Sequence, residues 1–186
     1  TSGNLVFNQV EPGDLRHGHT LTPTDIFAMD ELPLGIHVSN NYFTLTTDLQ
    51  LDDVSGDSWT PVAGVLKAGT RVRSHLLHTD LVSATNVFTG SITFDCGKIA
   101  GIIFTDTGLT NSNFLARPTS HFSSGFQGLE GNDHVTWSGN TLTFHSHNTG
   151  GVDEVRVLTT PEASSFAMIG FGALPVLLGL ARRSRK

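Results

Sequence analysis

Hydrophobic and polar residues alternate along much of the chain before residue 158, and this period of two is typical of half-buried β-strands. The alternation predicts strands over residues 43–51 and 88–94. Residues 99–104 form a short continuous apolar run, which predicts a strand covered on both faces. Residues 135–144 contain two alternating segments joined by Ser-Gly-Asn, which predicts a β-hairpin, and residues 152–158 predict a last strand.

Turn-forming segments rich in Gly, Asp, Asn and Ser separate these strands. No segment before Phe166 shows a sustained helical period. Short strands with regular turns predict an all-β domain, a β-sandwich or jelly roll, over residues 1–158. A domain of about 150 residues buries enough apolar surface to be stable without disulfides.

The pattern changes completely in the last part of the chain, residues 159–186. Residues 163–181 contain no charged side chain and no polar helical face, and 19 residues in a helix extend about 28 Å, close to the thickness of a bilayer core. We therefore predict a transmembrane helix over residues 164–181; a buried C-terminal core helix is the alternative. The basic tail at 182–186 would stop transfer and stay in the cytoplasm, which leaves the domain on the far side. Its basic residues are Arg182, Arg183, Arg185 and Lys186.

Charge and cysteine content limit the classes of function. Residues 1–162 carry all 17 acidic residues and seven of the 11 basic ones, a net charge of −10. An acidic domain argues against nucleic-acid binding, which needs a positive surface. Cys96 is the single cysteine, so no intrachain disulfide forms, and we expect it to be a small apolar residue. Because no signal-peptide pattern follows Thr1, we expect either a mature start or a leader that precedes it.

The Pro161-Glu162 pair, the apolar segment and the arginine-rich end together resemble the PEP-CTERM sorting signal of exported proteins in Gram-negative bacteria. The family's usual Val-Pro-Glu-Pro stands here as Thr160-Pro161-Glu162-Ala163. The resemblance implies that an exosortase recognises residues 159–186 in the inner membrane, cuts near them and releases the mature protein to the cell surface or the medium. In this family such proteins are often linked to extracellular polysaccharide. A permanent membrane anchor is the alternative.

A second resemblance concerns the domain itself. Segments 74–80, 90–95, 99–103 and 152–157 are similar to a recurring ectodomain of PEP-CTERM proteins. These segments consist mainly of strand residues, so the resemblance implies a fold and no particular activity.

Nine histidines are a high number for this length, and two pairs have notable spacing. His145 and His147 lie two apart on a predicted strand and so share a face, where they could bind zinc or copper if His17 and His19 supplied further ligands. The alternative is a pair of solvent-facing histidines. His75 and His78 lie three apart and so point to opposite faces, and we expect His78 to pack or hydrogen-bond at the core edge.

Two further features could bind a ligand. Asp48, Asp52, Asp53 and Asp57 surround a turn and could bind calcium, although we favour turn formation because the EF-hand spacing is not met. Trp59 lies in a turn-rich segment, so it could be exposed and stack on a sugar, whereas Trp137 alternates with Val135 and belongs in the core.

The chain contains no nucleophile elbow, no His-Glu-x-x-His and no Walker loop. A carboxylate pair for glycoside hydrolysis could still come from Asp106, Asp133, Asp153 or Glu154, but solvent-exposed surface acids explain them equally well.

The sequence thus predicts an exported, non-enzymatic protein of structural or adhesive type. Its predicted partners are an exosortase-like enzyme, the inner membrane and extracellular polysaccharide, with no cofactor other than calcium. One alternative is a carbohydrate-binding module with Trp59 and the acidic turn as its site. The other is a hydrolase with an unrecognised carboxylate pair.

Overall fold

The computed structural model describes residues 4–8, 14–16, 25–31, 42–81, 86–95, 97–122, 127–148 and 151–162. Within these residues, strands dominate and the helices are two short turns, so the predicted all-β class is confirmed. No helix in this part of the chain is long and apolar enough to cross a membrane. The predicted transmembrane segment, the basic tail, Cys96, His17 and His19 lie outside the described residues.

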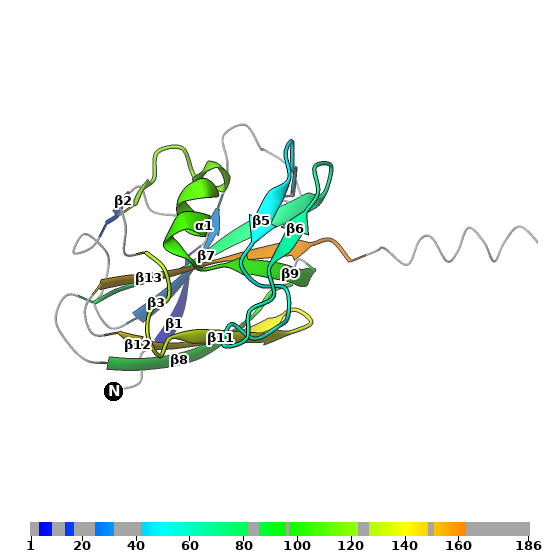
Figure 1. Cartoon of the computed structure of the whole chain (residues 1–186). Coiled ribbons are helices and arrows are strands. Elements are labelled where there is room, and N and C mark those ends of the chain that lie inside the picture. The colour runs from blue at the N-terminus through cyan, green and yellow to red at the C-terminus, as the bar shows by residue number, and fades with distance from the viewer. Residues whose placement is uncertain are drawn as a thin grey trace, which may run out of the picture.

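A central sheet forms the middle layer of the molecule (Figure 1). The strand order is β1 (Asn4–Asn8), β3 (Asp25–Glu31), β7 (Arg71–Leu81), β13 (Gly151–Thr160) and β9 (Lys98–Ile103), and β4 (Phe43–Thr44) also pairs with β7. Strands β1 and β3 are parallel, whereas the other pairs are antiparallel. Both edges of β13, the predicted last strand, are paired, so it lies at the centre of the fold.

A three-stranded antiparallel sheet packs against one face of the central sheet. It contains β11 (His134–Ser138), β12 (Thr141–Asn148) and β8 (Asn86–Thr93), in that order. The main apolar core lies between the two sheets, with Val135 and Phe144 facing Leu77 and Val157. The predicted hairpin is confirmed, and Gly139 supplies the positive φ that its turn requires.

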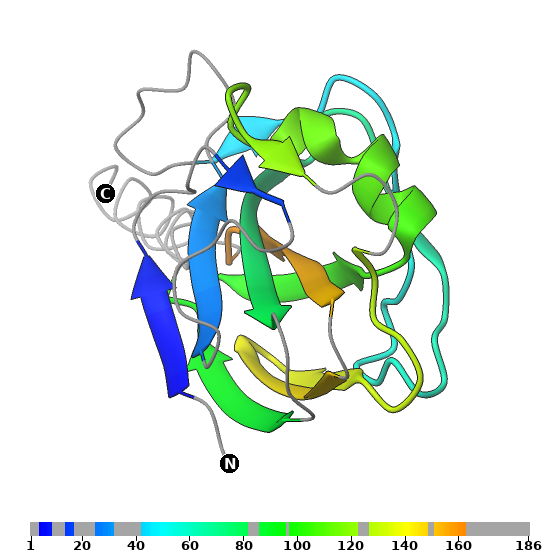
Figure 2. The same ribbon diagram turned by 90° about the vertical axis from the view of Figure 1, so that its left-hand side faces the viewer.

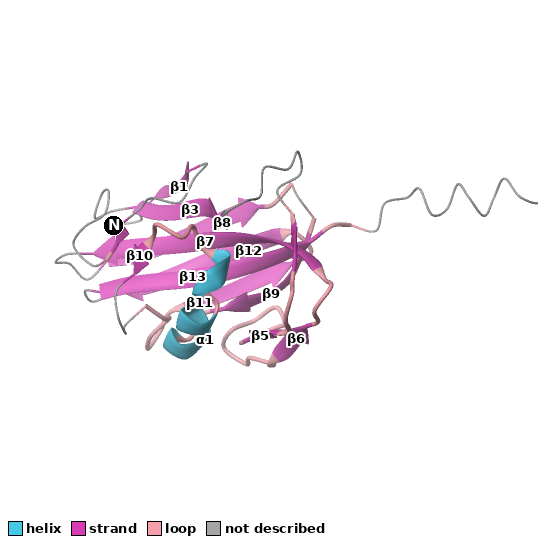
Figure 3. Ribbon diagram, turned by 90° about the horizontal axis from the view of Figure 1, so that it is seen from above, coloured by secondary structure: helices cyan, strands magenta, loops and turns pink. Residues whose placement is uncertain are grey.

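The opposite face of the central sheet is covered by α1 (Asp106–Asn111), the 3₁₀ turn η1 (Asn113–Leu115) and the hairpin of β5 (Leu49–Leu51) and β6 (Gly64–Leu66). Figures 2 and 3 show α1 lying across this sheet, on the side away from β8 and β12. Beside it, β2 (Asp14–Leu15) and β10 (His121–Phe122) pair in parallel over a third apolar cluster. Strand β9 is therefore covered on both faces, with Ile102 in one apolar cluster and Ile103 in the other, as the apolar run at 99–104 predicted.

Two local predictions need correction. Residues 43–51 form two short strands, β4 and β5, separated by a bend at residues 46–47. After the bend, the Asp48 carboxylate accepts hydrogen bonds from the Ala68 N–H (2.9 Å) and Lys67 Nζ (2.8 Å). Helix α1 was not predicted; the Thr105 side chain caps it by accepting from the Gly108 N–H. Its six residues are too few to show a helical period.

Candidate functional site

The outer face of the three-stranded sheet carries an ordered array of uncharged polar side chains. Neighbouring strands place Thr93 Oγ1 2.9 Å from Thr141 Oγ1, and Ser91 Oγ 2.9 Å from Thr143 Oγ1. The third row joins Thr89 Oγ1 to His145 Nδ1 at 3.2 Å. We call this surface the hydroxyl face; it consists of Thr89, Ser91, Thr93, His134, Thr136, Ser138, Thr141, Thr143 and His145.

An aromatic stack closes one end of the hydroxyl face. The rings of His134 and His145, partners across β11 and β12, lie 4.3 Å apart and nearly parallel. Trp59 packs on the other side of His134 with ring centroids 4.8 Å apart, and 53% of Trp59 is exposed. The turn-rich sequence around Trp59 predicted its exposure, but nothing local could pair it with His134, which lies 75 positions further along the chain.

The loop that carries Trp59 is tied to the sheet. Ser58 exchanges two hydrogen bonds with Val135: its N–H donates to the Val135 carbonyl (3.0 Å), and its Oγ accepts from the Val135 N–H (2.8 Å). The Asp57 carboxylate accepts from the Trp59 N–H at 3.0 Å. The backbone of the loop at Trp59 is therefore attached to β11.

The hydroxyl face is made of hydroxyl and imidazole side chains. It contains no acidic or strongly basic residue, and its two histidines face each other. Partial burial, followed by the electrostatic effect of His134, lowers the pKa of His145 from its ordinary value. This favours the neutral imidazole, so the face offers mainly hydroxyl groups, imidazole nitrogens and aromatic rings.

The positions of the histidines can be compared with the predicted zinc or copper site. His145 and His147 do share a side of β12, but the stacking partner of His145 is His134. The Nδ1 atom of His145 already bonds to Thr89. Among the described residues, no three His, Cys, Asp or Glu side chains are grouped as metal ligands.

The four acidic residues of the predicted calcium site each hold a piece of backbone. Asp48 accepts from the Ala68 N–H and Asp57 from the Trp59 N–H, as described above. Asp52 Oδ2 accepts from the N–H groups of Phe104 and Thr105, both at 2.8 Å. Asp53 is buried, and its Oδ1 accepts from the N–H groups of Ser55 and Val62. Asp53 and Asp57 thus bond to backbone two residues ahead, as turn-forming aspartates do, whereas Asp48 and Asp52 connect segments that are distant in the sequence.

The two acidic residues of β13 are not solvent-exposed surface acids, contrary to that interpretation of the sequence. Glu154 is 1% exposed and bonds to His78 Nδ1 at 2.9 Å. Asp153 is 5% exposed and accepts from Ser146 Oγ at 2.7 Å and Thr79 Oγ1 at 3.3 Å. Burial, assisted by the negative charge of Asp133, raises the pKa of Asp153 to about 6.

A buried ion pair, not anticipated from the sequence, crosses the central sheet. Arg156 is fully buried and donates from Nε and Nη2 to the two carboxylate oxygens of Glu31, both at 2.7 Å. Its Nη1 donates to the Leu109 carbonyl (3.0 Å) and to Ser112 Oγ. The alternation of Val155, Arg156 and Val157 was the only available signal, since it places Arg156 on the face opposite two core residues.

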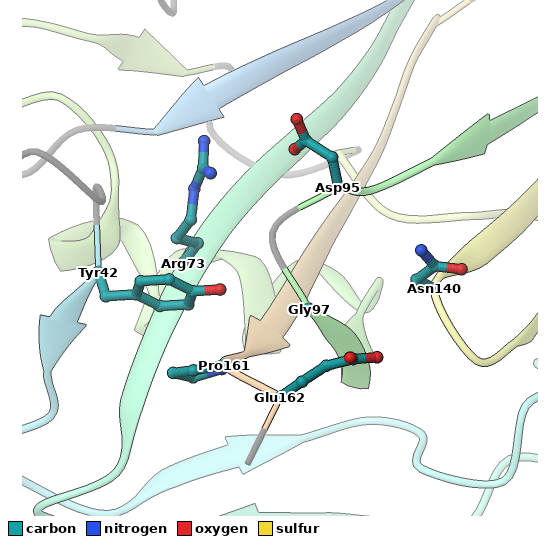
Figure 4. A pocket seen from close by; sticks show the side chains of 7 residues that line it. All are labelled: Tyr42, Arg73, Asp95, Gly97, Asn140, Pro161 and Glu162. Carbon is teal, nitrogen blue, oxygen red and sulfur yellow. The ribbon is translucent and has the colours of Figure 1, made fainter. Parts of the chain in front are cut away.

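Pro161 and Glu162 of the predicted sorting motif are exposed and directly follow β13, whereas Ala163 lies outside the described residues. They border a cavity of about 480 Å³, shown in Figure 4, with Tyr42, Arg73, Asp95, Gly97 and Asn140.

Comparisons with protein-family models, with curated proteins and with solved structures find no match to this chain.

Proposed function

We propose that this chain is an exported, non-catalytic protein of structural or adhesive type that binds extracellular polysaccharide on its hydroxyl face. The observation that carries the proposal is the stack of Trp59 on His134 and His145, continued by paired hydroxyl groups. In this proposal an adhesive protein attaches to polysaccharide by acting as a carbohydrate-binding module, so the two functions predicted from the sequence are combined. We further propose that the two packed sheets represent a jelly-roll-like ectodomain.

The chemistry of the hydroxyl face supports a neutral, polyhydroxylated ligand. Sugar rings present apolar C–H faces, which suit an exposed aromatic ring, and hydroxyl groups that both donate and accept hydrogen bonds. Strand geometry spaces the rows of the face about 6.7 Å apart along each strand and about 4.8 Å apart between strands. A repeating polymer can therefore contact several rows at once, and modest individual contacts add up.

The proposal of export depends on the C-terminal segment. Pro161 and Glu162 are exposed and directly follow the sheet, so a processing enzyme could reach them without unfolding β13. The proposed sequence of events is insertion of residues 164–181 in the inner membrane, retention of the basic tail in the cytoplasm and cutting by an exosortase-like enzyme. The intact mass of the protein from its native cells tests this. Loss of everything after about residue 161, in the outer or extracellular fraction, supports sorting and release, whereas the full-length mass in the inner membrane indicates a permanent anchor.

Binding to polysaccharide is tested with the full-length chain in mild detergent, using affinity electrophoresis in gels that contain the host's own extracellular polysaccharide or plant and bacterial glucans. The Trp59→Ala variant should lose about tenfold or more in affinity, because the aromatic platform supplies much of the contact. Phe114→Ala is the matched control, since Phe114 is a similarly exposed aromatic residue near α1, away from the hydroxyl face.

Retardation of the wild type that Trp59→Ala does not reduce would refute the site, and no retardation on any of these polymers would refute the function. Repeating the gels with calcium and with a chelator tests whether the acidic turn contributes. Equal binding in both gels would show that the acidic turn contributes no calcium-dependent affinity.

A further inference from the structure

Two neighbouring cavities lie where the end of β13, the β8–β9 connection and the β11–β12 turn meet. The cavity of about 480 Å³ in Figure 4 shares Arg73 and Asp95 with a second cavity of about 320 Å³, which Asp30, His75, Ile92, Thr93 and Phe94 also line. We call the two together the Arg73 groove. Each cavity lies within the size range of small-molecule sites, roughly 300–1,000 Å³.

A buried chain of hydrogen bonds fixes the arginine of this groove. Arg73 Nη2 donates to Asp30 Oδ2 at 2.7 Å, Asp30 Oδ1 lies 2.6 Å from His75 Nδ1, and His75 Nε2 lies 3.2 Å from Thr159 Oγ1. Burial acts to raise the pKa of Asp30, but the hydrogen bond from His75 and the charges of His75 and Arg73 outweigh it and lower that pKa. Asp30 is therefore ionised at neutral pH and holds the guanidinium group in place.

The walls of the groove supply the complementary groups. Among the described residues only Asp30 bonds to the Arg73 guanidinium, through Nη2, so Nε and Nη1 remain as donors for a ligand. Asn140 Nδ2 donates to the Phe94 carbonyl at 2.8 Å, which leaves its Oδ1 as an acceptor beside the carboxylates of Asp95 and Glu162. Figure 4 shows Arg73, Asp95, Asn140 and Glu162 among the residues that line the larger cavity.

We propose that the Arg73 groove binds a single terminal ring of a neutral saccharide. Vicinal hydroxyl groups can accept from Arg73 while they donate to Asp95 or Asn140, both of which remain after the proposed cut near residue 161, so one ring satisfies both kinds of group. An anion would be repelled by the Asp95 carboxylate, and an apolar ligand would leave the polar walls without partners. Because Arg73 and its partners are already held in place, little ordering cost remains on binding.

The position of the groove relates it to the hydroxyl face. Thr93 belongs to both, since it forms the last row of the face with Thr141 and also lines the smaller cavity. A glycan lying along the hydroxyl face from Trp59 would therefore bring its end to the groove. This link deepens the proposed function and rests on it, whereas the groove chemistry itself does not depend on the face.

The test is titration of the full-length chain in mild detergent with glucose, galactose, mannose, xylose, cellobiose and maltose, followed by calorimetry and ligand-observed NMR. The wild type should bind at least one of these sugars with saturation. Asp95→Ala should weaken that binding by about tenfold, since it removes an acceptor that a sugar hydroxyl would use. Asp95 is exposed and bonds to no other described side chain, so the unfolding midpoint should not change.

Glu130→Ala is the matched control: it removes the same charge from another exposed site and should leave sugar affinity unchanged. Trp59→Ala should retain short-sugar binding while it loses polysaccharide binding, which separates failure of the groove from failure of the face. The groove proposal is overturned if no sugar saturates the wild type or if Asp95→Ala binds as the wild type does.

Discussion

The two packed sheets use their polar side chains in opposite ways. The central sheet buries charged and titratable groups, among them Arg156, Glu31, Glu154 and Asp153. The three-stranded sheet keeps hydroxyl and imidazole groups exposed or half-buried on its outer face. Buried charges must be matched by fixed partners and so determine stability, whereas exposed neutral groups cost little to change and remain accessible to a ligand.

This contrast separates structural from functional roles. A polar group in the central sheet should affect folding when it is altered, whereas one on the hydroxyl face should affect binding and leave folding almost intact. The Arg73 groove is the place where the two meet, because the buried Asp30 and His75 position a side chain that lines a cavity.

The largest effect is expected from breaking the buried ion pair. Arg156→Met leaves the buried Glu31 carboxylate without its charge partner and with only the Ser74 hydroxyl as a side-chain donor, and the free energy of unfolding should fall by about 3–5 kcal/mol. Urea denaturation followed by the fluorescence of Trp59 and Trp137 measures this change. The double variant Glu31→Leu/Arg156→Met should recover most of the lost stability. A loss below about 1 kcal/mol in the single variant, as expected for a surface ion pair, would contradict the proposed difference between the two sheets.

Substitution of Asp153 should increase the free energy of unfolding, in contrast to Arg156→Met, and the increase should depend on pH. Its pKa of about 6 in the folded state lies above that of an unfolded aspartate, so the folded state favours the proton and loses stability as pH rises from about 4 to 6. Asp153→Asn should therefore raise the free energy of unfolding at pH 7 by up to about 3 kcal/mol and leave it nearly unchanged at pH 4.

Denaturation curves at several pH values measure the Asp153 effect. Asp95→Asn, an exposed aspartate, is the control and should show no such pH-dependent difference. Equal effects of Asp153→Asn at pH 4 and pH 7 would show that burial of the charge is not the cause.

An intermediate effect is expected where a loop carboxylate holds backbone N–H groups. Asp52→Ala removes the acceptor for Phe104, Thr105 and the Thr105 hydroxyl, and should cost about 2 kcal/mol. Thermal melting with calcium and with a chelator completes the test. A calcium-dependent shift in the wild type that disappears in Asp52→Ala would assign the carboxylate to a metal ion instead of a turn.

The smallest change in stability is expected on the hydroxyl face. Thr143→Val keeps the β-branched shape and removes the hydroxyl group that pairs with Ser91, so unfolding should change by less than about 0.5 kcal/mol. Polysaccharide affinity should nevertheless fall a few-fold in the gel assay. If Thr143→Val lost much stability but bound polysaccharide as the wild type does, this hydroxyl group would have a structural role and no role in binding.

Sequence alternation predicted the elements with a clear period, and their physical basis is local. The hairpin at 135–144, the doubly covered strand at 99–104 and the last strand at 152–158 all appear in the structure. Residues 43–51 illustrate the limit: alternation correctly placed Leu45, Leu49 and Leu51 inside, but the strand is interrupted by a bend at residues 46–47, after which Asp48 contacts residues 67–68, which are distant in sequence.

The candidate site was only partly accessible from the sequence. The exposure of Trp59 and the shared side of His145 and His147 follow from local pattern. The ring partner of both Trp59 and His145 is His134, and it is decided by the register of β11 with β12 and by the loop that Ser58 attaches to Val135. The Arg73 groove had no local signal, since its residues come from six separate segments.

By itself the sequence determined the all-β class, the alternation of inner and outer residues, the acidic domain and the apolar, basic-ended tail, because each depends on neighbours along the chain. Only the tertiary structure decided that Arg156 meets Glu31 across 125 positions, that Asp153 and Glu154 are buried, and that Arg73 lines a cavity. The physical reason is that the alternation of apolar and polar residues shows only which side of a strand each residue occupies. The packing of distant strands decides whether that side meets solvent, a core or a partner of opposite charge.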